Sequence, residues 1–167
     1  MKRIAFLLLS LLFVINGAYA DKKKKVDEDL YKYEVEACSE VPATTGHITF
    51  KIWSYGKKKI LTNDYCMENA IHAVLFKGIP ASGANAGVKA LVPEGYEHHE
   101  KFFKRFFDGK YLQYVQLSNK GRRDAGDVIS LKKKRYKMAT TVVVNLKDLR
   151  TYLEQEKIIK PLDFLFN

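Results

Sequence analysis

The stretch that decides the fold is Lys132–Asn145, KKKRYKMATTVVVN. Every second residue from Tyr136 to Val144 is apolar or threonine, and this period of two predicts a β-strand with one buried face. Val143 places an apolar side chain on the other face, so we expect the strand at the centre of a sheet. The preceding Val128–Leu131 (VISL) is predicted either as a separate strand or as the first part of one long, bent strand.

Two further alternating segments stand in the first third of the chain. Tyr31–Ala37 alternates apolar with charged residues, and His47–Tyr55 places Ile48, Phe50 and Ile52 on one face. The stretch between them, Ser39–Gly46 (SEVPATTG), is rich in turn-forming residues. We therefore predict a hairpin whose loop is longer than the tight two-residue type.

Three helices are expected between and after these strands. The first follows N-cap residue types at 62–64 and ends at Gly78, the second begins near Pro93, and the third is capped by Asn145. Tyr111–Leu117 is predicted as another strand. This order predicts an α+β fold, with two or three helices packed on a mainly antiparallel sheet.

Four phenylalanines lie at helical spacing in the second expected helix: Phe102, Phe103, Phe106 and Phe107. Core packing is the ordinary role of aromatic side chains at this spacing, and we predict it here. The alternative is that these rings line a cavity, which would make the protein a carrier of an apolar ligand.

The first twenty residues have the features of a secretory signal peptide. Lys2 and Arg3 precede the apolar run Ile4–Ile15, and Ala18–Ala20 forms an A-x-A cleavage site. The run is about a dozen residues, shorter than the roughly 20 that a spanning helix needs, so we expect cleavage near Ala20. The predicted organisation is a signal peptide over 1–20, a charged mobile leader over 21–29 and a single α+β domain over 30–167. The mature protein is then secreted or periplasmic, and not an integral membrane protein.

The chain is basic, with a formal net charge of +10. Removal of Lys2 and Arg3 with the signal peptide would leave +8. An exported basic protein can meet anionic lipid or acidic polysaccharide, and this location disfavours nucleic acid as a partner. The densest basic region, our candidate binding surface, comprises Arg122, Arg123, Lys132, Lys133, Lys134 and Arg135. The alternative role for these residues is to keep an exposed strand edge soluble.

Cysteine and histidine residues do not form a recognisable metal or redox motif. Cys38 and Cys66 could form one disulfide in an oxidising compartment, or remain two buried thiols. His98 and His99 are adjacent, so on a helix they point about 100° apart and do not share one metal. We expect neither a metal site nor a cofactor.

Catalytic motifs are likewise lacking in the sequence: no hydroxyl residue stands in a G-x-S-x-G setting, and no glycine-rich stretch precedes G-K-[ST]. A non-enzymatic binding or assembly domain is therefore the first hypothesis. The alternative is a hydrolase of envelope glycan or peptide, with residues from loops 79–93 and 118–127. A cleft holding paired carboxylates, or Cys66 beside His72, would favour the enzyme.

The C-terminal stretch Tyr136–Ile159 runs from an alternating strand into N-L-x-x-L-R-x-Y-L-E. Together with Met67–Phe76 (MENAIHAVLF), it resembles the small envelope domain at the N-terminus of the flagellar ring protein FlgT and of related bacterial lipoproteins. Ile52–Tyr55 (IWSY) and the H-x-x-F-F-x-x-F-F helix are similar to a Bacteroidetes-type group of uncharacterised secreted proteins. The resemblance covers about half of the mature chain. It implies an α+β fold and assembly with an envelope partner, and it carries no catalytic residue.

Overall fold

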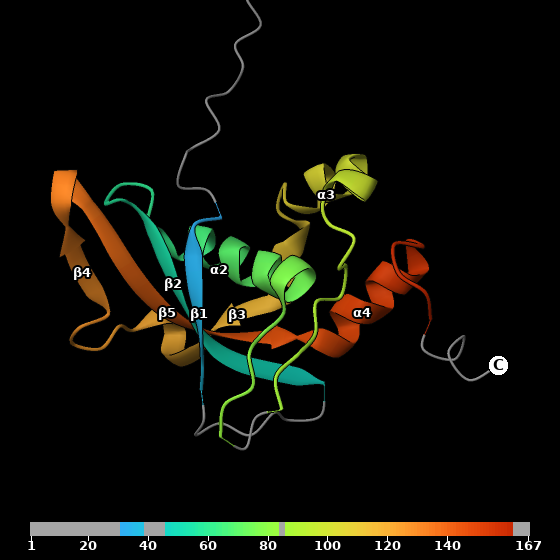
Figure 1. Ribbon diagram of the computed structural model, residues 1–167, viewed down its shortest axis with the longest axis horizontal. Coiled ribbons are helices and arrows are strands. Elements are labelled where there is room, and N and C mark those ends of the chain that lie inside the picture. The colour runs from blue at the N-terminus through green and yellow to red at the C-terminus, as the bar shows by residue number, and fades with distance from the viewer. Residues whose placement is uncertain (1–30, 39–45, 84–85, 162–167) are drawn as a thin grey trace, which may run out of the picture.

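The computed structural model describes residues 31–38, 46–83 and 86–161, and these form an α+β domain (Figure 1). Five antiparallel strands make one sheet in the order β1-β2-β5-β3, with β4 also paired to β5. Three helices pack on one face of the sheet. The predicted fold class is confirmed.

The N-terminal hairpin is formed by β1 (Tyr33–Ala37) and β2 (His47–Lys57). Tyr33 pairs with Ser54 and Ala37 with Phe50, so the predicted hairpin is confirmed. Ile48, Phe50 and Ile52 are buried under the helices. The predicted turn at 39–45 lies outside the described residues.

The deciding stretch forms β5 (Arg135–Asn145), which pairs with β2 on one side and with β3 and β4 on the other. Its central position is therefore confirmed. Of the two predictions for the preceding segment, the separate strand is correct: β4 (Val128–Leu131) pairs antiparallel with β5. The turn between them, Lys132–Lys134, is a short 3-10 segment.

Two predicted boundaries are wrong. The strand expected over Tyr111–Leu117 is only β3 (Val115–Leu117), because Lys110–Gln113 forms a 3-10 turn. This turn buries the ring of Tyr111, whose hydroxyl donates to the Asp64 carbonyl oxygen. The helix expected from Pro93 begins later, as a 3-10 turn at Glu97–His99 followed by α3 (Glu100–Phe106).

Helix α2 (Asn63–His72) begins where its capping residue predicts. The Thr62 side chain accepts a hydrogen bond from the Tyr65 amide. The helix continues as a π-helical turn, Ala73–Lys77, and ends at Gly78. Gly78 has φ +81°, and a Cβ there would lie 2.6 Å from the Val88 carbonyl oxygen, so glycine is required.

Helix α4 (Leu146–Gln155) is capped by Asn145, whose Oδ1 accepts a hydrogen bond from the Asp148 amide at 3.0 Å, as predicted. Leu149 and Leu153 face the core. After the helix, Ile158 is buried, so the apolar tail docks on the domain at this residue. The rest of that tail, from residue 162, lies outside the described residues, as do the predicted signal peptide and charged leader.

The phenylalanine helix supplies the aromatic part of the core. Phe102, Phe103 and Phe106 are at most 8% exposed, and Phe107 packs at the margin. Phe103 meets the ring of Phe76 edge-on at 4.9 Å and stacks with Tyr96 at 5.6 Å. These rings fill the space between the helices, so the prediction of core packing is confirmed.

Replacement of Phe103 by alanine should therefore lower the free energy of unfolding by about 3–5 kcal/mol, because the large buried ring leaves a cavity. Leu112→Ala is the control, since Leu112 is 41% exposed and its loss should cost less than about 0.5 kcal/mol. Urea unfolding followed by circular dichroism measures both. Equal, small losses would mean that α3 is not part of the core.

Candidate functional site

Strands β4 and β5 form a hairpin at one end of the sheet (Figure 1). All four residues of β4 are exposed. Val128 is 54% exposed, Ile129 43% and Leu131 36%, and successive strand residues point to opposite faces. The hairpin therefore presents apolar side chains on both faces, next to a turn of three lysines.

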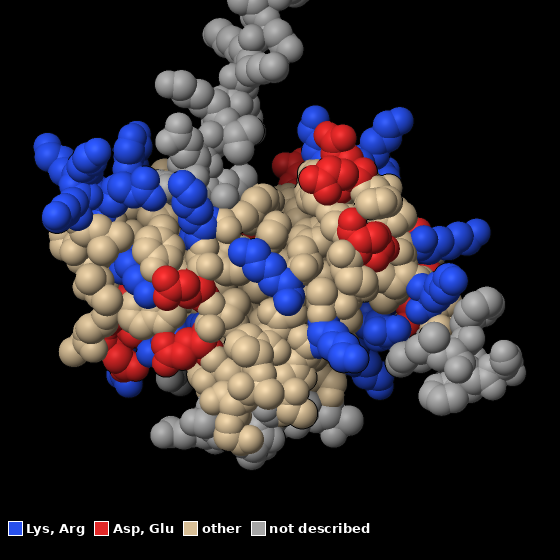
Figure 2. Space-filling model, viewed as in Figure 1, with Lys and Arg blue, Asp and Glu red and all other residues tan. Residues whose placement is uncertain are grey.

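The pairing of β2 with β5 places a second lysine run beside this turn. Lys57, the last residue of β2, pairs with Arg135, the first residue of β5. Figure 2 shows Lys and Arg side chains gathered at the end of the molecule that carries β4 in Figure 1. We call this group the basic corner; it comprises Lys57, Lys58, Lys59, Lys132, Lys133, Lys134 and Arg135.

The charges of the basic corner are largely uncompensated. Its six lysines are exposed and form no ion pair with a described residue. Elsewhere in the sheet, Lys51 Nζ lies 3.1 Å from Asp127 Oδ1, and Lys137 Nζ lies 2.5 Å from Glu34 Oε2. This end of the sheet therefore carries a group of lysine charges that are unpaired among the described residues.

The structure divides the predicted binding residues into two groups. Lys132, Lys133, Lys134 and Arg135 belong to the basic corner. Arg122 and Arg123 precede β4 at its other end, and Arg123 lines a pocket together with Lys58 of the basic corner. Sequence analysis missed Lys57–Lys59, because a lysine-rich turn after a strand is common and only the register shows which turn lies beside it.

An apolar pocket lies at the base of the hairpin. It has a volume of about 270 Å³ and is lined by Leu61, Val128, Tyr136 and Met138, with Lys58 and Arg123 as its charged members. Arg123 Nη2 donates a hydrogen bond to Asn63 Oδ1 in the first turn of α2. The pocket thus combines a carbon-lined wall with two cations.

A second cluster, between β1 and α2, contains titratable side chains. The Tyr33 hydroxyl and His72 Nδ1 are 2.7 Å apart, and the Tyr31 ring stacks on His72 with centroids 3.8 Å apart. The Tyr31 hydroxyl donates to Glu68 Oε1 at 3.2 Å. Burial, and then the nearby Lys77 charge, lower the pKa of His72 to about 4, whereas burial raises the pKa of Glu68. Neighbouring rings fill the space around His72, including Phe76 at 4.8 Å.

This arrangement does not supply the catalytic pair considered from the sequence. Cys66 is buried against the sheet, where burial raises the pKa of its thiol and the Ser54 hydroxyl lies beside it. His72 lies six residues later in the same helix and faces Tyr31 and Tyr33, so the two side chains point about 120° apart. Of the two segments considered for a hydrolase, Figure 1 shows the described part of the 79–93 loop below the C-terminal end of α2, and the 118–127 segment beside β4.

The two cysteines are also separated by the strand register. Ser54, which lies beside Cys66, pairs with Tyr33, and Cys38 stands five residues further along the same strand direction. Five extended residues span about 16 Å, whereas disulfide-bonded Cα atoms lie within about 7 Å. The structure has no bond between the two sulfurs.

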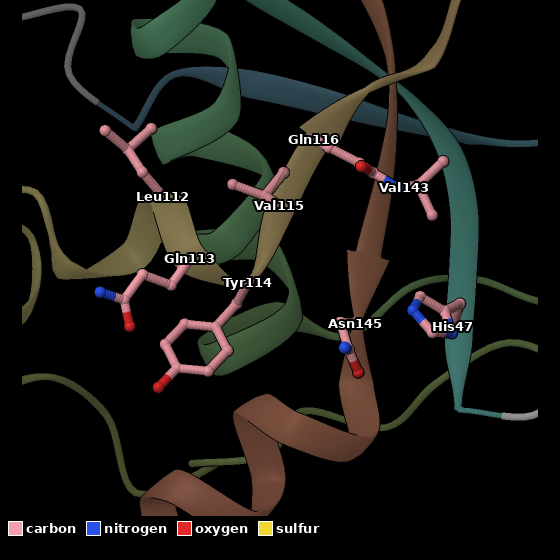
Figure 3. A pocket seen from close by; sticks show the side chains of 8 residues that line it. All are labelled: His47, Leu112, Gln113, Tyr114, Val115, Gln116, Val143 and Asn145. Atoms are coloured by element: carbon pink, nitrogen blue, oxygen red, sulfur yellow. The ribbon is translucent and has the colours of Figure 1, made fainter.

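A shallow polar pocket of about 270 Å³ lies at the junction of β2, β3 and β5 (Figure 3). Its side chains do not converge, because Gln113 and Tyr114 point away from His47 and Asn145. The Asn145 amide is already engaged with Asp148, as donor and as acceptor. This pocket therefore offers less recognition chemistry than the hairpin.

Of the two adjacent histidines of the sequence, His99 has an acidic neighbour in the structure. His99 Nε2 is 3.9 Å from Glu94 Oε1, at the surface. The described part of the chain holds no group of three or more His, Cys, Asp or Glu residues that could bind a metal ion. In the same part, no helix is long and apolar enough to cross a membrane.

Comparison of the chain with protein-family models, curated proteins and solved structures gave no match. The resemblance to the FlgT-type envelope domain therefore stays a hypothesis. The basic corner, the apolar β4 and the adjoining pocket are the features from which function is argued.

The neutral state of His72 predicts a pH dependence of stability. Its folded pKa, about 4, lies below the unfolded value of about 6.5, so the unfolded chain binds the proton first and stability falls as the pH drops from 6.5 to 4. The loss is about 2 kcal/mol after allowance for partial exposure. Urea unfolding at pH 7 and pH 4 should show the wild type losing this much more than His72→Gln.

Glu68 contributes with the opposite sign, because its raised folded pKa stabilises the fold as the pH falls. It is present in both proteins, so the difference between them isolates His72. If the stability difference between the wild type and His72→Gln is the same at pH 7 and pH 4, folding does not lower the pKa of His72.

The strand register predicts two thiols rather than a bridge. Protein isolated under oxidising conditions and denatured without reductant should bind two equivalents of a thiol reagent, and Cys38→Ser should bind one. In the native protein the Cys66 thiol should react slowly, because it is buried and its pKa is raised. Absence of reactive thiols in the denatured wild type would establish the disulfide instead.

Proposed function

We propose that this chain is an exported, non-enzymatic binding domain of the bacterial envelope that docks on an anionic lipid surface through the basic corner. The supporting observation is the joint exposure of six lysines, which have no ion-pair partner among the described residues, and of three apolar side chains on β4. The export step rests on the features of the first twenty residues, and the assembly role on the resemblance to the FlgT-type domain.

Electrostatic attraction supplies the first part of this binding. A lysine held near an anionic membrane contributes about 1 kcal/mol, and the attraction decays within a Debye length. Lysines already paired with carboxylates, such as Lys51 and Lys137, contribute little to it. The corner lysines form no ion pair with a described residue, so they are available for lipid phosphates.

The exposed apolar residues of β4 indicate which kind of anionic surface, lipid or glycan, is the better partner. Ile129 and Leu131 present carbon surface next to the charged turn, and such surface is stabilised when it leaves water for the interfacial region of a bilayer. A hydrated acidic polysaccharide offers the same charge but no apolar phase. The observed combination therefore favours a lipid surface.

Sedimentation with vesicles tests the docking. Mature protein should bind vesicles that contain one quarter phosphatidylglycerol, and binding should weaken with salt. The triple variant K132Q/K133Q/K134Q should lose about 100-fold in affinity, since three lysines at about 1 kcal/mol each are removed.

The matched control is K89Q/K101Q/K104Q, which removes the same charge from exposed lysines elsewhere. It should retain most of the binding. If both triple variants lose equally, net charge and not the basic corner governs binding. If the wild type does not sediment with these vesicles but does sediment with acidic cell-wall polysaccharide, the lipid proposal is wrong.

A further inference from the structure

The pocket at the base of the β4–β5 hairpin has the composition of a site for an amphiphilic anion. Leu61 and Met138 form a buried apolar floor, being 8% and 5% exposed. Val128, more than half exposed, and the Tyr136 ring form its walls. Most of the surface that a ligand would meet is therefore carbon.

The two cations of the pocket define the other end of such a ligand. Arg123 is held by Asn63, so its guanidinium is oriented by the first turn of α2. Lys58 is an exposed member of the basic corner. No carboxylate belongs to the described lining, so these cations are left to bind an acid group. A planar guanidinium can bind a carboxylate or a phosphate through two hydrogen bonds.

We propose that this pocket binds a short acyl chain, or the part of a longer chain next to its acid group, and that Arg123 and Lys58 bind the acid group of the same molecule, a fatty acid or an anionic lipid. The inference rests on the proposed function, because the lipid surface beneath the basic corner would supply the ligand. A volume of about 270 Å³ suits a short or partly inserted chain rather than a whole lipid.

The register of the hairpin provides a matched pair of variants. Val128 pairs with Met138 and lines the pocket, whereas Ile129 pairs with Lys137 and points to the opposite face. The Lys137 side chain lies on the face of the sheet without helices, where its Nζ is 4.8 Å from the Trp53 ring centroid. Val128→Asp and Ile129→Asp therefore make the same chemical change at neighbouring exposed positions, and only the first places a carboxylate in the pocket.

Equilibrium dialysis of labelled decanoate, below its micelle concentration and without vesicles, tests the pocket directly. Val128→Asp should weaken decanoate binding at least tenfold, and Ile129→Asp should change it less than twofold. Lys58→Gln and Arg123→Gln should weaken decanoate but not decanol, which has the chain without the acid. Equal effects of the two aspartate variants, or equal binding of both ligands by the wild type, would overturn the assignment.

The vesicle and dialysis experiments test membrane docking and the pocket independently of each other. Decanoate bound by the wild type and by K132Q/K133Q/K134Q, in a protein that does not sediment with vesicles, would support the pocket and refute membrane docking. Vesicle binding by a protein that takes up no decanoate would refute the pocket and leave docking intact. Unchanged denaturation midpoints of the aspartate variants exclude unfolding as a cause.

Discussion

The pairing of β2 with β5 is the constraint on which the rest of the structure depends. It runs without interruption from His47 opposite Asn145 to Lys57 opposite Arg135. At one end it places Phe50 beside Val142, where helices cover both. At the other end the strands extend as far as the hairpin turn and place two lysine runs side by side. The register that buries the core therefore also builds the basic corner.

Helix α2 is positioned over this pairing by a polar contact as well as by apolar packing. Asn69 Nδ2 donates to Ser54 Oγ at 3.0 Å, and both residues are completely buried. Asn69 Oδ1 has no hydrogen-bond partner among the described residues, and such a buried group costs stability. Since apolar side chains at these positions would avoid that cost, we infer that the polar contact selects one placement of the helix on the sheet.

Local sequence patterns correctly predicted the elements that are determined by neighbouring residues in the chain. The alternation in β5 predicted its buried face and central position, and Asn145 predicted the start of α4 through its bond to Asp148. Local patterns failed where tertiary contacts override them. Tyr111 has the alternation of a strand, but its ring enters the core from a 3-10 turn and its hydroxyl donates a hydrogen bond to the Asp64 carbonyl oxygen. The apolar pattern was therefore assigned to the wrong backbone conformation.

The distinction between local patterns and tertiary contacts also explains why only part of the candidate site was predicted from the sequence. The lysines of the hairpin turn are visible in the sequence, but their proximity to Lys57–Lys59 depends on a pairing between residues about eighty positions apart. Exposed lysines at a strand edge can be explained by solubility alone, because charge opposes edge-to-edge association. Solubility does not require two lysine runs to lie side by side, and it does not explain why Val128, Ile129 and Leu131 are left exposed beside them. The proposed docking on an anionic lipid surface would account for both features, since the lysines would bind the headgroups while the apolar side chains would leave water.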